Sequence, residues 1–390
     1  MVLSLASAER FCDEVSLAMI ASGAAAFFAL SPLGGQVAQY GRHLAAAEAI
    51  MRSTSMPSSS TSTSPSSRIT LPRSLPARWA WLTQELPALL LAPVTFLLTL
   101  RALESAEMEK SSRWRWSFFF SSPSASASES LDSLPLLLSK TPLPNKLLLL
   151  AFTLHYAWRS LFFPFLIRGG KETRALEWVL ALVFCCWNGA LQGSGAALVG
   201  KRRTKRERTT ATTPSPSSSR LYLVLFSVSL CFWALFWGLN LAADAHLRSL
   251  RRRKKTTKKK SKTTTTTTAT TTANGKEKEE KVETELELED RGYKLPTSPL
   301  FALVACPNYA AECAEWLSFA AASLFASRAA AGEGSGRKSA VVLGEALPSL
   351  AFALFTAANL VPRALAHRRW YLEKFEDFPR GKKAIVPWVL

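Results

Sequence analysis

Four groups of polar side chains lie inside or beside long apolar stretches of this 390-residue chain, where ionisable groups are costly and usually functional. The first is Glu85, in the segment WLTQELPALLL. Burial favours the neutral carboxylic acid, which can donate a hydrogen bond to an oxygen that gains negative charge. The alternative is a structural role, as the partner of a buried arginine.

The second group lies in LHYAWRS, where His155 and Tyr156 precede Arg159 by four and three residues. On a helix this spacing places all three side chains on one flank. A buried arginine needs an anion or carbonyl oxygens, and a tyrosine hydroxyl can donate a hydrogen bond to a carbonyl. Taken alone, Tyr156 is typical of a packed aromatic residue, but its position beside Arg159 favours carbonyl binding.

The third group lies in GLNLAADAHLRSLR. Asn240, Asp244 and Arg248 recur every four residues, along one helix face, and Arg251 follows on a neighbouring flank. A carboxamide, a carboxylate and a guanidinium in a row suit an amide, a ribose hydroxyl and a phosphate. A helix end whose long side chains reach the membrane interface produces the same pattern.

The fourth group is the C-terminal tail, where His367 and Tyr371 share a helix face one turn after Arg363. The tail is cationic and aromatic, so an amphipathic interfacial helix is the alternative. No GxGxxG motif follows a strand, so a dinucleotide is not expected in a Rossmann domain.

The elements that position these groups are predicted to be membrane-spanning helices. Hydrophobic residues make up 48% of the chain and the net charge is +19, and the two properties are segregated along the sequence. We expect an all-α transmembrane bundle of about seven spans, at 15–33, 79–100, 147–167, 175–200, 221–239, 308–327 and 341–361. Acidic rather than basic residues precede the first, which favours an uncleaved span over a signal peptide.

Low-complexity stretches rich in Ser, Thr, Lys or Arg separate the spans. We interpret them as disordered inserts in a single membrane domain over 1–390, at 53–67, 105–142, 201–219 and 251–290. The basic run RRRKKTTKKKSK favours contact with anionic lipid over nucleic acid, since no RNA- or DNA-binding fold accompanies it.

Composition also excludes several classes and suggests an orientation. The six cysteines are unpatterned and the four histidines are scattered, which argues against a disulfide scaffold and a zinc site, so no metal is expected. The loops on the side of the C-terminal tail carry more Lys and Arg than those opposite. We therefore expect a cytosolic tail, although the KRRTKRER loop points the other way.

Several segments resemble the steroid 5-alpha-reductase (3-oxo-5-alpha-steroid 4-dehydrogenase) family in content and order. The most specific are QELP and EKFEDFPRGKKAIVP; the others are YGR (40–42), LHYAWRS, WNGALQG, GLNLAADAHLRSLR, GYKLP and NYAAECAEW. The resemblance implies a membrane reductase of the endoplasmic reticulum that uses NADPH. Such an enzyme transfers hydride to the β carbon of a 3-oxo-Δ4 steroid or sterol-like enone and yields the 5-alpha-reduced ketone.

The resemblance also assigns roles to residues. It makes Glu85 and Tyr156 catalytic, polarising the substrate carbonyl, with Arg159, Asn188 and Gln192 as supports of the substrate pocket. It places the cofactor-binding half at 293–390. The implied cofactor-binding residues are Arg168, Asn240, Asp244, Arg248, Arg251, Tyr293, Lys294, Asn308, Glu312, His367 and Tyr371.

The chain departs from the family pattern in three places. Ser298-Pro299 replaces a Gly pair, Ala311 replaces a glycine, and Ala242-Ala243 replaces His and Ser. The methyl group of Ala311 lies where the backbone is expected to approach the cofactor.

Three other functions compete with a steroid reductase. One keeps the chemistry but takes an enoyl-CoA or a polyprenol, one is a methyltransferase that uses S-adenosylmethionine, and one is a non-catalytic lipid-binding protein. The QELP element with HYxxR favours a steroid-like ketone over a thioester. NADPH binding separates the reductases from the other two classes.

Overall fold

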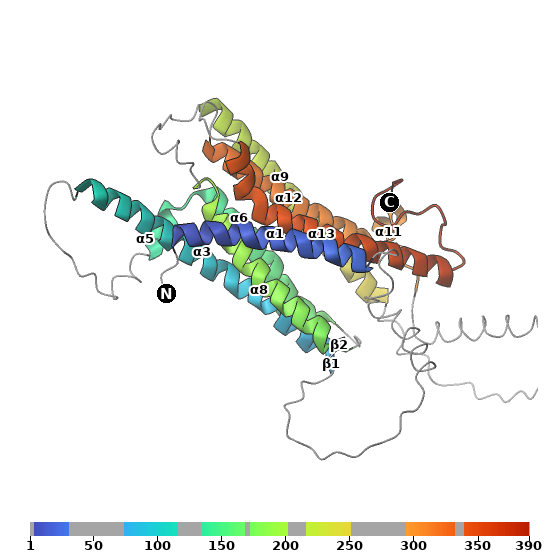
Figure 1. Cartoon of the computed structure of the whole chain (residues 1–390). Coiled ribbons are helices and arrows are strands. Elements are labelled where there is room, and N and C mark those ends of the chain that lie inside the picture. Colours follow the sequence, from blue (N-terminus) through green and yellow to red (C-terminus); the bar gives the residue numbers. More distant parts are fainter. Residues whose placement is uncertain are drawn as a thin grey trace, which may run out of the picture. The chain divides into compact units, whose positions relative to one another are not determined.

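The computed structural model describes residues 4–30, 74–115, 134–167, 172–201, 216–250, 294–331 and 339–389 (Figure 1). The chain divides into two compact units. Unit 1 comprises Met1–Leu235 and Cys313–Asn359, and unit 2 comprises Phe236–Glu312 and Leu360–Leu390. Helices α9, α12 and α13 contribute residues to each unit.

Helices dominate the described residues, as the sequence predicts. The strand pair is short, with β1 (Ser74–Leu75) antiparallel to β2 (Thr173–Arg174). The helical elements are α1 (Leu5–Leu30), α3 (Ala77–Arg115), α5 (Leu134–Lys140), α6 (Leu143–Ala157), the π-helical η1 (Trp158–Phe162), α7 (Phe163–Leu166), α8 (Ala175–Leu198), α9 (Pro216–Leu250), α11 (Pro299–Leu303), α12 (Pro307–Ala331) and α13 (Ser339–Lys374).

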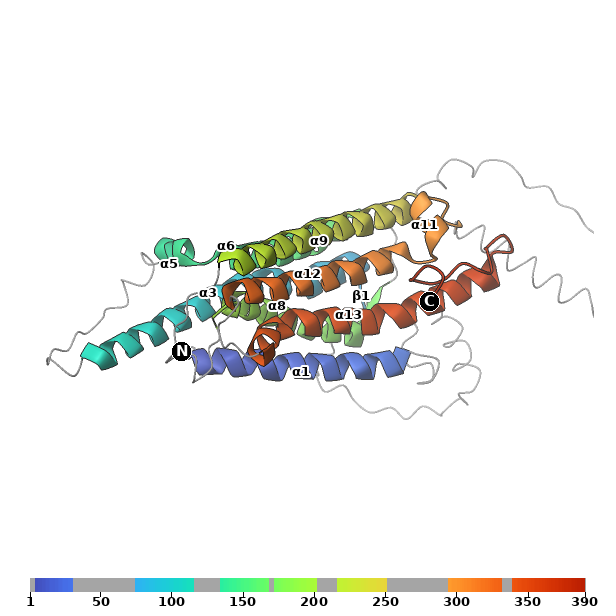
Figure 2. The ribbon, with the colours of Figure 1, turned by 90° about the horizontal axis from the view of Figure 1, so that it is seen from above.

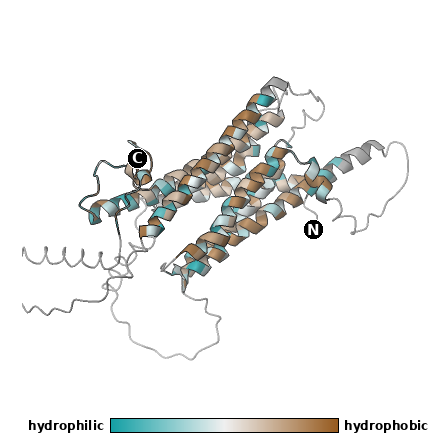
Figure 3. Cartoon of the chain, turned by 180° about the vertical axis from the view of Figure 1, so that it is seen from behind, coloured by the Kyte–Doolittle hydropathy of each residue, from teal (hydrophilic) through white to brown (hydrophobic). Residues whose placement is uncertain are grey.

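Five helices in the described part of the chain are long and apolar enough to cross a membrane, and hydrophobic residues line much of their length (Figure 3). They are Ala77–Glu107, Leu143–Leu166, Ala175–Leu198, Ser219–Leu250 and Val341–Lys374. A multi-span helical membrane protein is thus confirmed, but the predicted number of seven is not. Helix α12 contains the predicted span 308–327, and α1 contains residues 15–30 of the predicted span 15–33, whose last residues lie outside the described part of the chain. Each helix carries charged residues in its first half.

The low-complexity stretches fall mostly outside the described residues, including all of 53–67 and 251–290. The stretch 105–142 begins within α3 and contains α5 near its other end, so its borders are helical. Helix α9 begins at Pro216, inside the stretch 201–219.

Small residues bring α3 and α8 together in unit 1 (Figure 1). A Cβ atom on Gly189 would lie 2.7 Å from Ala88 Cα, and one on Gly193 would lie 2.1 Å from the Ala92 oxygen and 2.3 Å from Thr95 Oγ1. Only glycine fits such an approach. The Gly-x-x-x-Gly spacing is the close-packing pattern of membrane helices, so α8 is held at a fixed distance from α3.

Glycines also set the packing against α13 within unit 1. Figure 2 shows α1 beside the first part of α13, where a Cβ on Gly23 would lie 3.2 Å from Phe355 Cα. A Cβ on Gly195 would lie 2.9 Å from Pro348 Cβ. The α8 backbone therefore lies close to α13 as well as to α3.

Buried polar side chains close the C-terminal end of α8, where the last carbonyls lack helical partners. Asn145 Nδ2 donates to the carbonyls of Ala196 (2.8 Å) and Val199 (3.0 Å). Gly200 follows with a φ of +74°, which favours glycine. Its N–H donates to Glu345 Oε2 at 2.8 Å.

Unit 2 is closed by the C-terminal tail. The N–H groups of Ala305 and Cys306 donate to the carbonyls of Lys383 (2.8 Å) and Ala384 (2.9 Å). Arg368 holds the same tail by donating to the carbonyls of Lys382 and Arg380, at 2.6 and 2.8 Å. Burial raises the pKa of the Cys306 thiol to about 12, so this thiol stays protonated at neutral pH.

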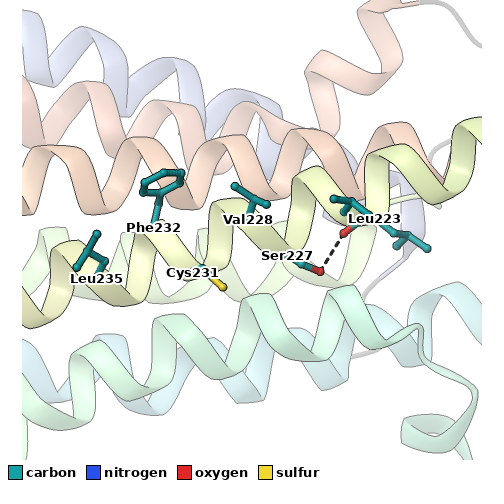
Figure 4. Close-up of a pocket in the computed structure, with 7 residues that line it drawn as sticks. Leu223, Ser227, Val228, Cys231, Phe232 and Leu235 are labelled. Carbon is teal, nitrogen blue, oxygen red and sulfur yellow. Dashed lines mark hydrogen bonds between the residues drawn. The ribbon is translucent and has the colours of Figure 1, made fainter.

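One face of α9 in unit 1 is open and apolar. Figure 4 shows this face, an open groove lined by Leu223, Val224, Ser227, Val228, Cys231, Phe232 and Leu235. In the most apolar segment of α9, only 17% of the residues are buried, whereas 50% are buried in the corresponding segment of α13. The groove carries no charged side chain, and its surface is typical of a helix face in contact with lipid.

Candidate active site and cofactor-binding residues

Glu85 and Arg159 form an ion pair between α3 and η1 in unit 1. Arg159 Nη2 donates to Glu85 Oε1 at 3.1 Å, and its Nε lies 3.4 Å from Oε2. The guanidinium carbon lies 4.9 Å from the ring centroid of Trp81. Cys185 Sγ lies 3.8 Å from Glu85 Oε2. The arginine thus has the anion that its membrane position requires.

Sequence reasoning missed Trp81 and Cys185 as neighbours of this pair. Trp81 stands four residues before Glu85 on α3, so helical spacing could have suggested a shared face. No sequence signal links Cys185 to Glu85, which lies 100 residues away.

Arg159 lies in the π-helical segment, whose cause is local. Pro164 has no N–H, so it cannot donate to the carbonyl of Ser160 as an α-helix requires. The N–H of Phe163 instead donates to the Trp158 carbonyl, the i→i+5 pattern of a π-helix. Such single π turns are frequent at functional sites.

Tyr156 is buried, and its hydroxyl is held by α8. Asn188 Nδ2 donates to the Tyr156 oxygen at 2.9 Å. Gln192 Nε2 donates to Asn188 Oδ1 at 3.2 Å and to the Pro348 carbonyl at 2.9 Å. Only 3% of Tyr156, none of Asn188 and 3% of Gln192 is exposed. The structure thus brings together all five residues that the sequence assigned to catalysis and the substrate pocket, which we call the unit 1 cluster: Glu85, Tyr156, Arg159, Asn188 and Gln192.

Glu85 has the arginine partner that one of its two predicted roles requires, because Arg159 donates to its carboxyl oxygens. Its other predicted role, polarising the substrate carbonyl, stays a prediction. Tyr156 adds a hydroxyl donor to the cluster.

His155 points to a different partner. Its Nδ1 lies 2.6 Å from Glu315 Oε1 on α12, and both residues are buried. The indole ring of Trp316 packs 4.6 Å from the imidazole. Sequence reasoning missed this pair, although an acidic residue in the middle of an apolar helix needs a buried partner.

The predicted cofactor-binding residues that the structure describes lie in unit 2. Asn308 Nδ2 donates to Asp244 Oδ1 at 3.2 Å and so joins α12 to α9. Asn240 and Arg248 lie one turn before and one turn after Asp244 on α9, as the four-residue spacing predicts. A buried amide, a carboxylate and a guanidinium thus follow one another along one helix.

The remaining predicted residues differ in their surroundings. The rings of His367 and Tyr309 lie 5.6 Å apart. Tyr371 is buried and stacks on Phe378, with 5.3 Å between centroids. Lys294 is exposed, Glu312 is partly buried, and Arg168, Arg251 and Tyr293 lie outside the described residues.

We call the described members of this set the unit 2 set: Asn240, Asp244, Arg248, Lys294, Asn308, Glu312, His367 and Tyr371. Its guanidinium, ammonium and imidazole groups suit phosphates, and its carboxylates suit ribose hydroxyls. His246, on α9 beside these residues, has a buried Nε2 with no hydrogen-bond partner in the described part of the chain. The donor set therefore fits a phosphorylated dinucleotide.

The described residues include no group of three or more His, Cys, Asp or Glu side chains that could hold a metal ion.

Comparison with known proteins places the chain among reductases. A family model described as 3-oxo-5-alpha-steroid 4-dehydrogenase matches residues 276–331 and 339–390. The 3-oxo-5-alpha-steroid 4-dehydrogenase 1 of Mus musculus is 31% identical over 248 residues, which cover 64% of this chain and 70% of the relative. The enzyme of that name from Homo sapiens is 28% identical over 318 residues, covering 81% of each chain. The steroid 5-alpha-reductase DET2 of Gossypium hirsutum is 40% identical over 101 residues, 26% of this chain and 31% of the relative. With these matches over a helical membrane fold, the chain belongs to the 3-oxo-5-alpha-steroid 4-dehydrogenase family of oxidoreductases.

Proposed function

We propose that this protein reduces the C=C bond of a 3-oxo-Δ4 steroid or sterol-like enone to the 5-alpha-reduced ketone, using NADPH. The observation that carries this proposal is the buried phenol of Tyr156, three residues before Arg159, which pairs with Glu85 of α3. Family membership supports the substrate class, since the relatives are named for this activity.

The unit 1 cluster supplies electrostatic stabilisation in this proposal. Negative charge builds on the ketone oxygen of the enone as hydride reaches the β carbon. A hydrogen bond from Tyr156 lowers the energy of that charge, and one such donor is typically worth about 10²–10³-fold in rate. Glu85 acts through Arg159, because the ion pair holds the guanidinium in place. Its positive charge therefore stays near the phenol, and the guanidinium is kept from contacting the hydroxyl itself. The α carbon of the resulting enolate then takes a proton from the solvent, which completes the saturated ketone.

The unit 2 set binds the cofactor in this proposal. When bound, NADPH would supply the hydride, and its oxidised product would be NADP⁺. Asp244 and Asn308 orient a ribose through their hydrogen-bonding groups, and Arg248, Lys294 and His367 bind phosphate oxygens. A cytosolic C-terminal tail, in a protein of the endoplasmic reticulum membrane, would place these residues on the side where NADPH is available.

The test is NADPH oxidation by the purified protein in lipid or detergent, with a 3-oxo-Δ4 steroid and a long-chain enoyl-CoA offered separately. We expect oxidation with the steroid and the 5-alpha-reduced ketone as product. Oxidation with the thioester alone would move the enzyme to fatty-acid elongation. No NADPH binding at all would refute the reductase.

A further inference from the structure

Tyr156 can polarise a ketone only if its proton points toward the substrate. A phenol has one proton to donate and lone pairs that accept. A neighbouring acceptor would take that proton into the protein, whereas a neighbouring donor leaves it available. The chemistry of the Tyr156 neighbour therefore decides whether the hydroxyl can act.

The backbone carbonyl of Pro348 determines whether Asn188 presents a donor or an acceptor to Tyr156. A carbonyl oxygen only accepts, so the Gln192 atom 2.9 Å away must be the Nε2 donor. The same Nε2 lies 3.2 Å from the Asn188 side chain and meets its oxygen, Oδ1. Asn188 is thereby turned so that its Nδ2 donates to the Tyr156 oxygen at 2.9 Å.

The surroundings keep this chain of hydrogen bonds in one direction. Asn188 and Gln192 are buried and one turn apart on α8. Gly189 and Gly193 follow them directly, and the close approach of these glycines to α3 leaves α8 no room to shift. Successive hydrogen bonds also polarise one another, which makes the phenol a better donor.

We propose that Asn188, oriented by Gln192 and the Pro348 carbonyl, is the positioning residue that directs the Tyr156 proton toward the substrate ketone. This inference rests on the proposed function and adds to it the source of the donor geometry. Asn188 itself need not touch the substrate.

The decisive variant is Asn188→Asp, which has almost the same shape but places an acceptor oxygen against the phenol. Tyr156 would then donate to the carboxylate, and the ketone would lose its donor. We expect kcat to fall about 10²–10³-fold, as for loss of a transition-state donor, while KM for the steroid and Kd for NADPH stay within about threefold. Combining it with Tyr156→Phe should cause no further loss, because both changes remove the same interaction.

Asn188→Leu separates this role from a structural one. Leucine removes the donor but offers no acceptor, so the phenol proton stays available part of the time. We expect a smaller loss than in Asn188→Asp, although leucine is the larger chemical change. Thr95→Val is the matched control, since it removes the Thr95 Oγ1 bond to the Ala190 carbonyl (3.1 Å) in the same helix interface. It should leave turnover near that of the unaltered protein.

A second measurement tests the orientation of the Tyr156 hydroxyl without depending on turnover. Infrared difference spectroscopy of a bound 3-oxo steroid reports the carbonyl stretch, which shifts to lower frequency when a donor polarises it. We expect this shift in the unaltered protein and its loss in Asn188→Asp. If the unaltered protein shows the shift but no turnover, the proposed function fails and the positioning role stands. If Asn188→Asp keeps both turnover and shift, or if the losses in the double variant multiply, the positioning role is overturned.

Discussion

The unit 1 cluster and the unit 2 set differ in how deeply most of their polar side chains are buried. In unit 1, the polar groups of Glu85, Tyr156, Asn188 and Gln192 are buried and hydrogen-bonded to other protein groups. In unit 2, Lys294 is exposed and Asp244, Arg248 and His367 are only partly buried. The unit 1 cluster has few charged groups and is tightly packed. The unit 2 set has several charged groups, and these are more exposed to solvent.

This difference in burial matches different chemical roles for the two regions. Groups that stabilise charge in a transition state must be fixed before the reaction, because reorganisation would cost the energy that they provide. Groups that bind a large, highly charged ligand need accessible donors that the ligand can satisfy. This difference in burial agrees with the proposed division, in which unit 1 carries the chemistry and unit 2 binds the cofactor, and four predictions test it.

The largest effect is expected from the buried His155–Glu315 pair, which supports unit 1 without belonging to its cluster. Glu315→Ala leaves His155 without its carboxylate partner, and breaking a buried pair typically costs about 3–5 kcal/mol. A marked fall in Tm of the detergent-solubilised protein is the measurement. Glu14→Ala, at an exposed position on α1, is the control, and equal melting of the two variants would contradict the assignment.

The next effect concerns the phenol. Tyr156→Phe should lower kcat about 10²–10³-fold and leave the Kd for NADPH unchanged, because the hydroxyl belongs to unit 1 and the cofactor donors to unit 2. Steady-state kinetics and fluorescence titration with NADPH measure the two quantities. Tyr222→Phe, on α9, should change neither. A Tyr156→Phe variant that keeps full turnover would remove the phenol from the mechanism.

Asn308→Ala should give the reverse result. Loss of its amide removes the hydrogen bond to Asp244 and the proposed contact with the cofactor, and a hydrogen bond to a charged group is worth about 1.5–3 kcal/mol. The Kd for NADPH should rise about 10–100-fold, with kcat near normal at saturating NADPH. The increase in Tm that NADPH produces should shrink in parallel.

The helical amide Asn359, which donates to the Phe355 carbonyl at 3.0 Å in unit 1, provides the comparison for that experiment. Asn359→Ala should keep the NADPH-dependent increase in Tm. If Asn308→Ala and Asn359→Ala respond alike, unit 2 has no special part in cofactor binding.

The smallest effect is expected at Ala311, where the family pattern has glycine. The residue is 6% exposed on α12, and Ala311→Gly should cost about 1 kcal/mol of stability through helix propensity. NADPH should bind a few-fold more tightly if the methyl group restricts the cofactor. Ala310→Gly has the same cost in helix propensity but changes a residue that is not the one where the family has glycine. A difference in the Kd for NADPH between the two variants therefore isolates the effect of the Ala311 methyl group. Identical Kd values would show that the departure is neutral.

The sequence by itself determined the helices and the chemical character of their polar residues. Uncharged apolar runs of about 20 residues have one stable form in a membrane, because every backbone N–H and C=O must bond within the helix. The regular spacing of Asn240, Asp244 and Arg248 likewise predicts a shared face on α9, and a polar residue inside such a run, such as Glu85, was already a functional candidate.

The contacts between residues that are distant in the sequence come from the packing of the helices. Arg159 pairs with Glu85 across 74 positions, and His155 pairs with Glu315 across 160. The Pro348 carbonyl that orients Gln192 lies 156 positions away and carries no sequence signal, since every residue has a carbonyl. Local spacing fixes the face of a helix, but the neighbour of that face depends on how glycines and side chains let the helices approach, and this is a property of the packed fold.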